Sequence, residues 1–176
     1  MELKIDRPPR TAMEVFRLLP EGTLCEVIEN QLYMAPPPNE PHQKISFRLL
    51  LQLGNFITDK DLGEVRHSPY GVYLNEENAV EPDIFFVLKR NCGIIHKDGL
   101  HGAPDLIIEI LSPSNKKHDT ITKKLLYERF GVKEYWIVNP ETREVIGYEL
   151  VKGRYSEIAK AIGKLNSRLL DHEFSF

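Results

Sequence analysis

The chain has 176 residues, of which 41% are hydrophobic and 28% are charged, and its formal net charge is −3. This size and composition are typical of one globular domain with its own core, so we expect a single domain over residues 1–176. The small charge excludes nucleic-acid binding by bulk electrostatics, and neither a membrane span of ~18–20 apolar residues nor a secretory signal is visible. With only two cysteines as well, we expect a soluble, cytoplasmic protein without a membrane partner.

The first half of the chain predicts two helices and three strands. A capping box that starts at Thr11 favours a short helix. Residues 23–35 indicate two strands, folded at the Glu-Asn pair in their middle. Asn39 can cap a second helix, whose buried face carries apolar side chains at helical spacing (Ile45, Leu49, Leu53 and Phe56). Residues 65–74 then indicate a strand that bends at a proline and a glycine.

Two near-continuous apolar runs, residues 80–88 and 105–111, dominate the second half. Such runs are typical of central strands that are covered on both faces. Residues 91–103 between them indicate a mobile loop. The remaining elements are a helix over 117–130 that ends at a glycine, a strand over 135–138, and a hairpin over 144–151 and 154–159. We therefore expect the α/β class, in an α+β arrangement with one central mixed sheet flanked by helices.

Three carboxylates stand inside stretches that otherwise predict buried strands. Asp83 follows a proline in the first apolar run, Glu109 lies in the middle of the second, and Glu26 shares a strand face with apolar neighbours. A buried unpaired carboxylate costs several kcal/mol, whereas carboxylates that converge on one point can hold a hard cation such as Mg²⁺. The alternatives are an exposed acid on an edge strand for Glu26, a strand-start cap for Asp83 and a buried salt bridge for Glu109.

A lysine of the 117–130 helix completes this set. At about 100° per residue, Lys123 lies on the apolar face that we expect to pack on the sheet, and Lys124 lies about 100° further round. Lys123 could therefore reach Glu109 and a bound water or phosphate; the alternative is an ordinary lysine that extends to solvent. Residues 116–135 also hold more bases than acids, so Lys124 is a candidate for contact with a substrate phosphate. The alternative is a solvated helix face of mixed charge.

Together these residues resemble a known family. The resemblance is carried by Pro82-Asp83, by the segment EILSPSN from Glu109 to Asn115, by Asp119, Lys123 and Tyr127, and by the segment GVKEYWIVNP from Gly131 to Pro140. They are similar to the bacterial Uma-two family, long catalogued as a domain of unknown function. That family belongs to the restriction-endonuclease-like PD-(D/E)XK superfamily. The similarity runs from about Cys25 to the C-terminus.

The resemblance implies a restriction-endonuclease-like core and a metal site. Asp83 and Glu109 match the acidic pair that holds Mg²⁺, with Mn²⁺ as a substitute, and Glu26 matches the upstream acid. The superfamily's lysine lies two residues after the glutamate, where this chain has Leu111. Lys123 matches a catalytic lysine that is relocated to the following helix.

Three other positions have a counterpart in the family pattern. His42 matches a recurrent histidine at the start of the first long helix and is a candidate for substrate contact, with a polar contact at the helix end as the alternative. Pro104-Asp105 has the same two residues as the superfamily motif, but it lies only four residues before Glu109, too close to be the motif's acidic partner of Glu109. Asn139 stands where the family usually has aspartate, in a position that we expect to be structural.

We therefore expect an enzyme, a Mg²⁺-dependent endonuclease that hydrolyses the phosphodiester bonds of DNA, acting as a monomer or a homodimer. The alternative from another class is a non-catalytic nucleic-acid-binding or regulatory module that retains the nuclease fold. Metal binding that depends on Asp83 and Glu109 separates the two. A metal-free hydrolase with two carboxylates, as in glycosidases, fits less well because no aromatic cluster predicts a sugar platform.

Overall fold

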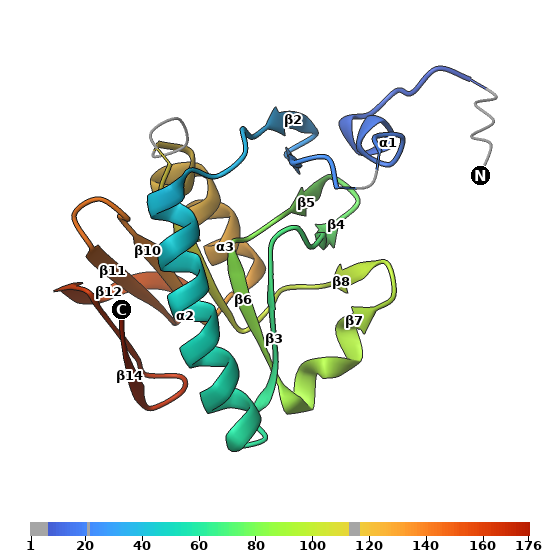
Figure 1. Ribbon diagram of the computed structural model, residues 1–176. Coiled ribbons are helices and arrows are strands. Elements are labelled where there is room, and N and C mark those ends of the chain that lie inside the picture. The colour runs from blue at the N-terminus through green and yellow to red at the C-terminus, as the bar shows by residue number, and fades with distance from the viewer. Residues whose placement is uncertain (1–6, 21, 113–116) are drawn as a thin grey trace.

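The structure, a computed structural model, describes residues 7–20, 22–112 and 117–176. Its helices are α1 (Ala12–Phe16), α2 (Glu40–Asp59), the 3₁₀ helix η1 (Lys89–Ile94), the π-helix η2 (His118–Lys123) and α3 (Lys124–Phe130). Its strands are β1 (Cys25–Ile28), β2 (Gln31–Met34), β3 (Gly63–His67), β4 (Val72–Asn75), β5 (Asn78–Val80), β6 (Ile84–Leu88), β7 (Ile95–His96), β8 (Gly99–His101), β9 (Leu106–Ile110), β10 (Glu134–Val138), β11 (Glu144–Val151), β12 (Arg154–Ile162), β13 (Lys164–Ser167) and β14 (His172–Ser175). Residues 113–116, which belong to the EILSPSN segment and the basic stretch, lie outside the described residues (Figure 1).

The strands form two six-stranded sheets and a hairpin. The central sheet has the order β12-β11-β10-β9-β6-β3 and is mixed, because β9 and β10 are parallel while its other neighbours are antiparallel. The second sheet has the order β2-β1-β5-β4-β8-β7, and β13 pairs with β14. The predicted α/β class with a central mixed sheet is confirmed, but the sequence pattern does not predict the second sheet.

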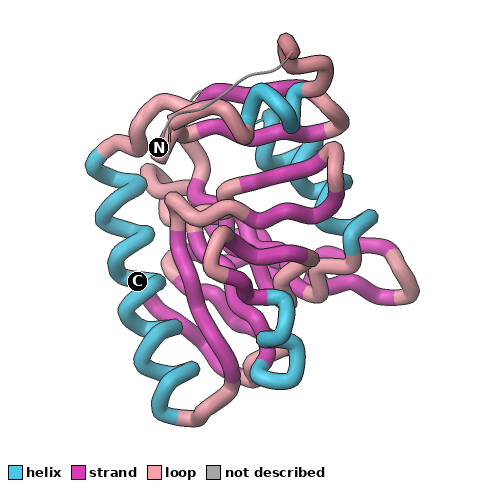
Figure 2. Tube along the Cα trace, turned by 90° about the vertical axis from the view of Figure 1, so that its right-hand side faces the viewer, coloured by secondary structure: helices cyan, strands magenta, loops and turns pink. Residues whose placement is uncertain are grey.

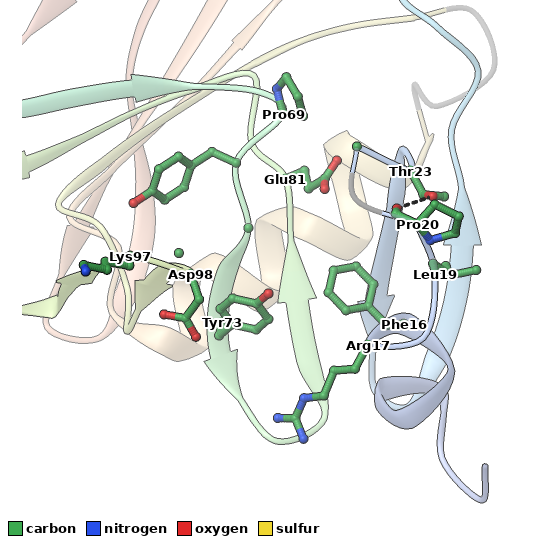
Figure 3. Close-up of a pocket in the computed structure, with 14 residues that line it drawn as sticks. Phe16, Arg17, Leu19, Pro20, Thr23, Pro69, Tyr73, Glu81, Lys97 and Asp98 are labelled. Carbon is green, nitrogen blue, oxygen red and sulfur yellow. Dashed lines mark hydrogen bonds between the residues drawn. The ribbon is translucent and has the colours of Figure 1, made fainter. Parts of the chain in front are cut away.

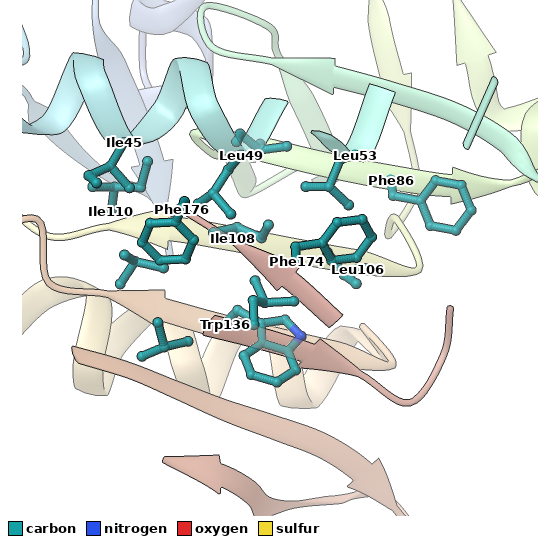
Figure 4. Packing of buried hydrophobic residues seen from close by; sticks show 14 of the residues in the cluster. Ile45, Leu49, Leu53, Phe86, Leu106, Ile108, Ile110, Trp136, Phe174 and Phe176 are labelled. Carbon is teal, nitrogen blue, oxygen red and sulfur yellow. The ribbon is translucent and has the colours of Figure 1, made fainter. Parts of the chain in front are cut away.

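The central sheet is covered on both faces, as its apolar strands require. In β9, Leu106, Ile108 and Ile110 pack with α2 in one core, as Figure 4 shows. Ile107 packs with α3 and the second sheet in another core. Figures 1 and 2 show α2 running along one face of this sheet. Since side chains alternate along a strand, Glu109 points to the α3 side.

Helix caps form where the sequence predicts them. The Thr11 hydroxyl accepts a 3.1 Å hydrogen bond from the Glu14 amide at the start of α1. The Asn39 side chain accepts a 3.2 Å hydrogen bond from the His42 amide at the start of α2. Gly131 ends α3 with a φ of +81°, which glycine adopts without steric cost. The Asn39 cap places His42 in the first turn of α2, where its side chain is buried.

Two predicted strands are each divided by a passage between the sheets. Residues 65–74 contribute β3 to the central sheet and β4 to the second, and residues 80–88 contribute β5 to the second and β6 to the central sheet. The two passages lie side by side, because the Ser68 amide donates a 3.1 Å hydrogen bond to the Asp83 carbonyl. Pro82 has no amide hydrogen with which to continue a ladder. Asp83 therefore stands at the junction of the sheets rather than inside one strand.

The predicted loop over residues 91–103 is wrong, because it contains β7 and β8 at the edge of the second sheet. These strands are two and three residues long, too short to show a periodic pattern. The β13–β14 hairpin, whose Phe174 joins the core beneath α2, is also not predicted from the sequence. In the described ranges, no helix is long and apolar enough to cross a membrane.

Candidate active site

Acidic side chains from separate elements line one small pocket between the two sheets. Its volume is about 90 Å³. The acids are Glu26 of β1, Glu81 and Asp83 of the passage from β5 to β6, Glu109 of β9 and Asp119 of η2. Lys123 of η2 and His42 of α2 also line it. Every predicted site residue except Lys124 therefore meets at this pocket.

Glu109 is buried in the middle of β9, with 3% of its surface exposed. Its Oε1 accepts a 3.0 Å hydrogen bond from Lys123 Nζ and a 2.7 Å hydrogen bond from the Tyr127 hydroxyl. Both donors come from the helical segment that packs on this face of the sheet. The buried salt bridge that the sequence left as the alternative for Glu109 is present, and it forms within the pocket.

The Lys123 ammonium lies at the centre of three carboxylates. Its Nζ is 2.9 Å from Glu26 Oε1, 3.0 Å from Glu109 Oε1 and 3.5 Å from Asp119 Oδ1. The residues from His118 to Lys123 form a π-helix rather than the predicted α-helix. Asp119 and Lys123 are nevertheless one turn apart and share its buried face.

The two neighbouring lysines diverge, as the helical phase predicts. The Lys123 side chain is 6% exposed, whereas Lys124 Nζ lies 3.9 Å from the centre of the Tyr148 ring and outside the pocket. Contact between Lys124 and substrate stays a prediction.

Asp83 is held by the strand that carries Glu109. Its Oδ2 accepts a 2.7 Å hydrogen bond from the Ile110 amide, so the two acids occupy adjacent parts of the pocket wall. The same oxygen lies 3.1 Å from His42 Nε2. His42 therefore contacts Asp83 through its ring, in addition to the helix-end contact of its backbone amide with Asn39.

The two glutamates that share Lys123 have pKa values displaced in opposite directions. Burial alone would raise the pKa of Glu26, but the Lys123 ammonium, His118 and the Glu81 amide hold this pKa at about 2. Burial raises the pKa of Glu109 well above its usual value; Lys123 opposes this, and neighbouring carboxylates add to it. Burial would lower the pKa of Lys123, but these carboxylates raise it well above the usual range. Lys123 is therefore a fixed positive charge at neutral pH and not a base.

Sequence reasoning assigned no site role to Glu81, Asp119 or His118. Burial raises the pKa of Glu81 to about 7, and the charge of Glu26 adds to this effect. The His118 ring packs on Tyr33 with centroids 4.6 Å apart, and its Nε2 lies 3.6 Å from Glu26 Oε2. The sequence offered a signal for Asp119, because this acid lies one helical turn before Lys123. Nothing in the sequence marks His118 as a residue of the site.

The donor set of the pocket fits a hard divalent cation. Among the described residues, no three His, Cys, Asp or Glu side chains are arranged to hold one metal ion. Asp83 Oδ1 and Glu109 Oε2, however, accept no hydrogen bond within the described ranges. Mg²⁺ usually takes one or two carboxylates and completes its shell with water and substrate phosphate, and Mn²⁺ prefers similar oxygen ligands. Among the described residues that line the pocket, five acids stand against one lysine, so a phosphate needs a cation to enter.

Asp105, the second match to the Pro-Asp motif, is structural. Its carboxylate accepts hydrogen bonds from the Leu88 amide at 2.8 Å and from Asn91 Nδ2 at 2.9 Å, and it pairs with Lys133 at 2.5 Å. The Asn139 side-chain oxygen accepts hydrogen bonds from two backbone amides of the turn after β10, in agreement with a structural role.

The central mixed sheet thus lies between α2 and α3, and β9 and the passage from β5 to β6 bring acids to one pocket. A solved structure from Anabaena variabilis, described as a putative nuclease belonging to DUF820, has this fold, with a TM-score of 0.75 and 17% identity over 93% of this chain and 92% of that chain. Residues 12–170 match the Uma2 family, described as "Putative restriction endonuclease". The chain therefore belongs to the Uma2 family. No curated protein matches it.

Proposed function

We propose that this protein is a cytoplasmic, divalent-metal-dependent nuclease that hydrolyses phosphodiester bonds of DNA. The observation that carries the proposal is the convergence of Asp83, Glu109, Glu26 and Lys123, from separate elements, on one acidic pocket. Membership of the Uma2 family supports nuclease chemistry at that pocket.

Each residue of the pocket has a role in this proposal. Asp83 and Glu109 would hold Mg²⁺, because both carboxylates line the acidic pocket. A bound divalent cation supplies Lewis-acid chemistry, which acidifies water and stabilises negative charge on phosphate. Lys123 adds a fixed charge that stabilises the phosphate as negative charge develops in the transition state. Glu26 keeps the ammonium in place through its 2.9 Å ion pair.

The direct experiment is a cleavage assay. End-labelled single-stranded DNA, duplex DNA and RNA are incubated with the protein and Mg²⁺, Mn²⁺ or EDTA. We expect DNA to be cleaved with either metal and to stay intact with EDTA. Preferential cleavage of RNA would show that the substrate is RNA rather than DNA. Intact substrates under all conditions would contradict the proposal.

Metal binding should stabilise the protein more at about pH 8 than at about pH 6. The pKa values of Glu109 and Asp119 are raised, mainly by burial, so protons compete with the metal as the pH falls. The stabilisation by metal is therefore largest above these raised pKa values and is lost on acidification. Calorimetric melting with and without millimolar Mg²⁺ measures it. An equal Tm with and without metal at both pH values would argue against a metal site.

Replacing His42 with alanine should weaken metal binding by about 10–100-fold, the usual effect of removing a group that orients a metal ligand. The ring is 3.1 Å from Asp83 and fixes one carboxylate oxygen. His42→Gln, which can donate from a similar position, should restore part of the affinity. Titration calorimetry with Mn²⁺ measures the affinity, with His67→Ala as the control because His67 is exposed. An unchanged affinity in His42→Ala would remove His42 from the site.

A further inference from the structure

A second, larger pocket adjoins the acidic pocket. Its volume is about 570 Å³, within the ~300–1,000 Å³ usual for ligand sites. It lies between α1, the passage from β3 to β4 and the turn between β7 and β8, as Figure 3 shows. Glu81 lines both pockets, and it precedes Asp83 by two residues. The two cavities therefore share one wall.

Three aromatic side chains from two different parts of the fold line this larger pocket: Phe16 of α1, Tyr70 and Tyr73. The rings of Phe16 and Tyr73 are nearly perpendicular, at 80°, with centroids 6.2 Å apart. Figure 3 shows Phe16, Tyr73 and Glu81 around the same space. Aromatic walls of this kind suit a planar ring, and every nucleobase has a face that can stack on them.

The charges divide the pocket into a part for phosphate and a part for a base. Lys97 is exposed in the turn between β7 and β8 and has no ion pair within the described ranges. Arg17, whose side chain is 55% exposed, pairs with Glu76 at the surface. Glu81 lies instead at the wall shared with the acidic pocket, and Asp98 is paired with His101 at 3.1 Å. A carboxyl group repels phosphate but accepts a hydrogen bond from the amino group of a base such as cytosine.

We propose that this pocket binds an unstacked, amino-bearing nucleobase of the substrate strand, next to the phosphate held at Asp83 and Glu109. This specificity subsite rests on the proposed nuclease function. Two extended residues span at most about 7 Å, so a base beside Glu81 and a phosphate at Asp83 belong to neighbouring nucleotides. Phe16 and Tyr70 supply stacking surfaces, as does the face of Tyr73 that does not stack on His101. The Glu81 carboxylate accepts a hydrogen bond from the amino group, and Lys97 contacts the adjoining phosphate.

An abasic scan of the substrate tests the pocket. Single-stranded oligonucleotides, each lacking one base, are titrated by fluorescence anisotropy with Ca²⁺ in place of Mg²⁺. Removal of one particular base should weaken binding by about 5- to 150-fold, the loss typical of one stacked base, and removal of distant bases should have little effect. Phe16→Leu and Tyr73→Leu should remove this dependence on position, whereas Tyr73→Phe should retain it. Thymine, which has no amino group, should bind more weakly than cytosine at that position.

The proposed phosphate contact of Lys97 has a matched test. Lys97→Ala should weaken binding to all of these oligonucleotides and lower the dependence of log affinity on log salt by about 1, the loss of one phosphate contact. Arg90→Ala removes an equal charge from an exposed residue of η1 that does not line the pocket, and it should leave both quantities unchanged.

The outcomes separate the subsite from the nuclease function. Cleavage by the native protein, together with equal affinity for every abasic oligonucleotide, overturns the subsite and leaves the nuclease function. Absence of both binding and cleavage overturns both. The scan is made on the native protein, so this decision stands even if a leucine variant does not fold. Equal binding of thymine and cytosine overturns the assignment of Glu81 as the acceptor.

Discussion

Replacing Lys123 with alanine should reduce the rate at which bound DNA is cleaved by about 10²–10³-fold, the usual effect of removing one electrostatic stabiliser, while Lys124→Ala should cleave bound DNA at the native rate. Both lysines stand next to each other on one helical segment, so they differ in surroundings and not in composition. Lys123 Nζ lies 3.0 Å from Glu109, whereas Lys124 Nζ lies against the Tyr148 ring. Single-turnover rates on one labelled DNA, with the metal and protein preparation held constant, compare the two variants.

The same pair of variants should differ in stability. Lys123→Ala leaves Glu26 and Glu109 buried without their cation, and removal of one partner of a buried ion pair typically costs about 3–5 kcal/mol. For a chain of this size, that loss lowers Tm by about 6–20 °C. Lys124→Ala loses only a cation–π contact at a partly exposed site, about 0.5–1 kcal/mol. Rates are therefore compared below the Tm of the weaker variant.

Three other results of the comparison between Lys123→Ala and Lys124→Ala would change the assignment of the catalytic lysine or of the function. Loss of cleavage in Lys124→Ala alone would place the catalytic cation on the Tyr148 side of the helix. Native rates in both variants would exclude a catalytic lysine here. Nucleic-acid binding without cleavage in every preparation, native included, would support the non-catalytic module.

Asp83→Asn and Glu109→Gln should each abolish metal binding, with a loss of at least about 100-fold in affinity for Mn²⁺. Each change removes a charged oxygen ligand but keeps the size of the side chain, and neutral amides are poor replacements in a pair of hard-cation ligands. Glu109→Gln should cost less stability than Lys123→Ala, because the amide oxygen can still accept hydrogen bonds from Lys123 and Tyr127, and Lys123 keeps Glu26 and Asp119 as ion-pair partners.

Titration calorimetry measures the affinity, and circular dichroism confirms that the variants fold. Glu64→Gln is the matched control, because Glu64 is an exposed acid of β3 outside the pocket. Unchanged Mn²⁺ affinity in both Asp83→Asn and Glu109→Gln would place any metal elsewhere in the protein.

The sequence alone was sufficient to predict the main residues of the candidate site. Glu109 interrupts a strand that is apolar on both faces, and such a charge requires a partner whatever the fold. Lys123 follows from helical phase, and this inference holds although His118 to Lys123 form a π-helix, because residues one turn apart still share a face. Asp83 was found as a carboxylate inside an apolar run, but its surroundings were not predicted, because it lies where the chain passes between the two sheets.

Features set by tertiary contacts were beyond the sequence. The second sheet is built from strands as short as two residues, which carry no measurable period. The contact between His42 and Asp83 joins residues 41 positions apart, and the pairing of His118 with Tyr33 depends on how η2 meets the second sheet. Glu81 has no sequence signal beyond its place beside Pro82, and its role emerges because two pockets share its side chain.

The single-turnover cleavage of duplex DNA in Mg²⁺ by the native protein and by Glu109→Gln, purified identically, decides whether the acidic pocket is the site of hydrolysis. We expect cleavage by the native protein, a rate at least about 100-fold lower in Glu109→Gln, and an equally folded variant. Equal rates in the two preparations would show that the pocket around Glu109 is not the site of hydrolysis and would contradict the proposed function.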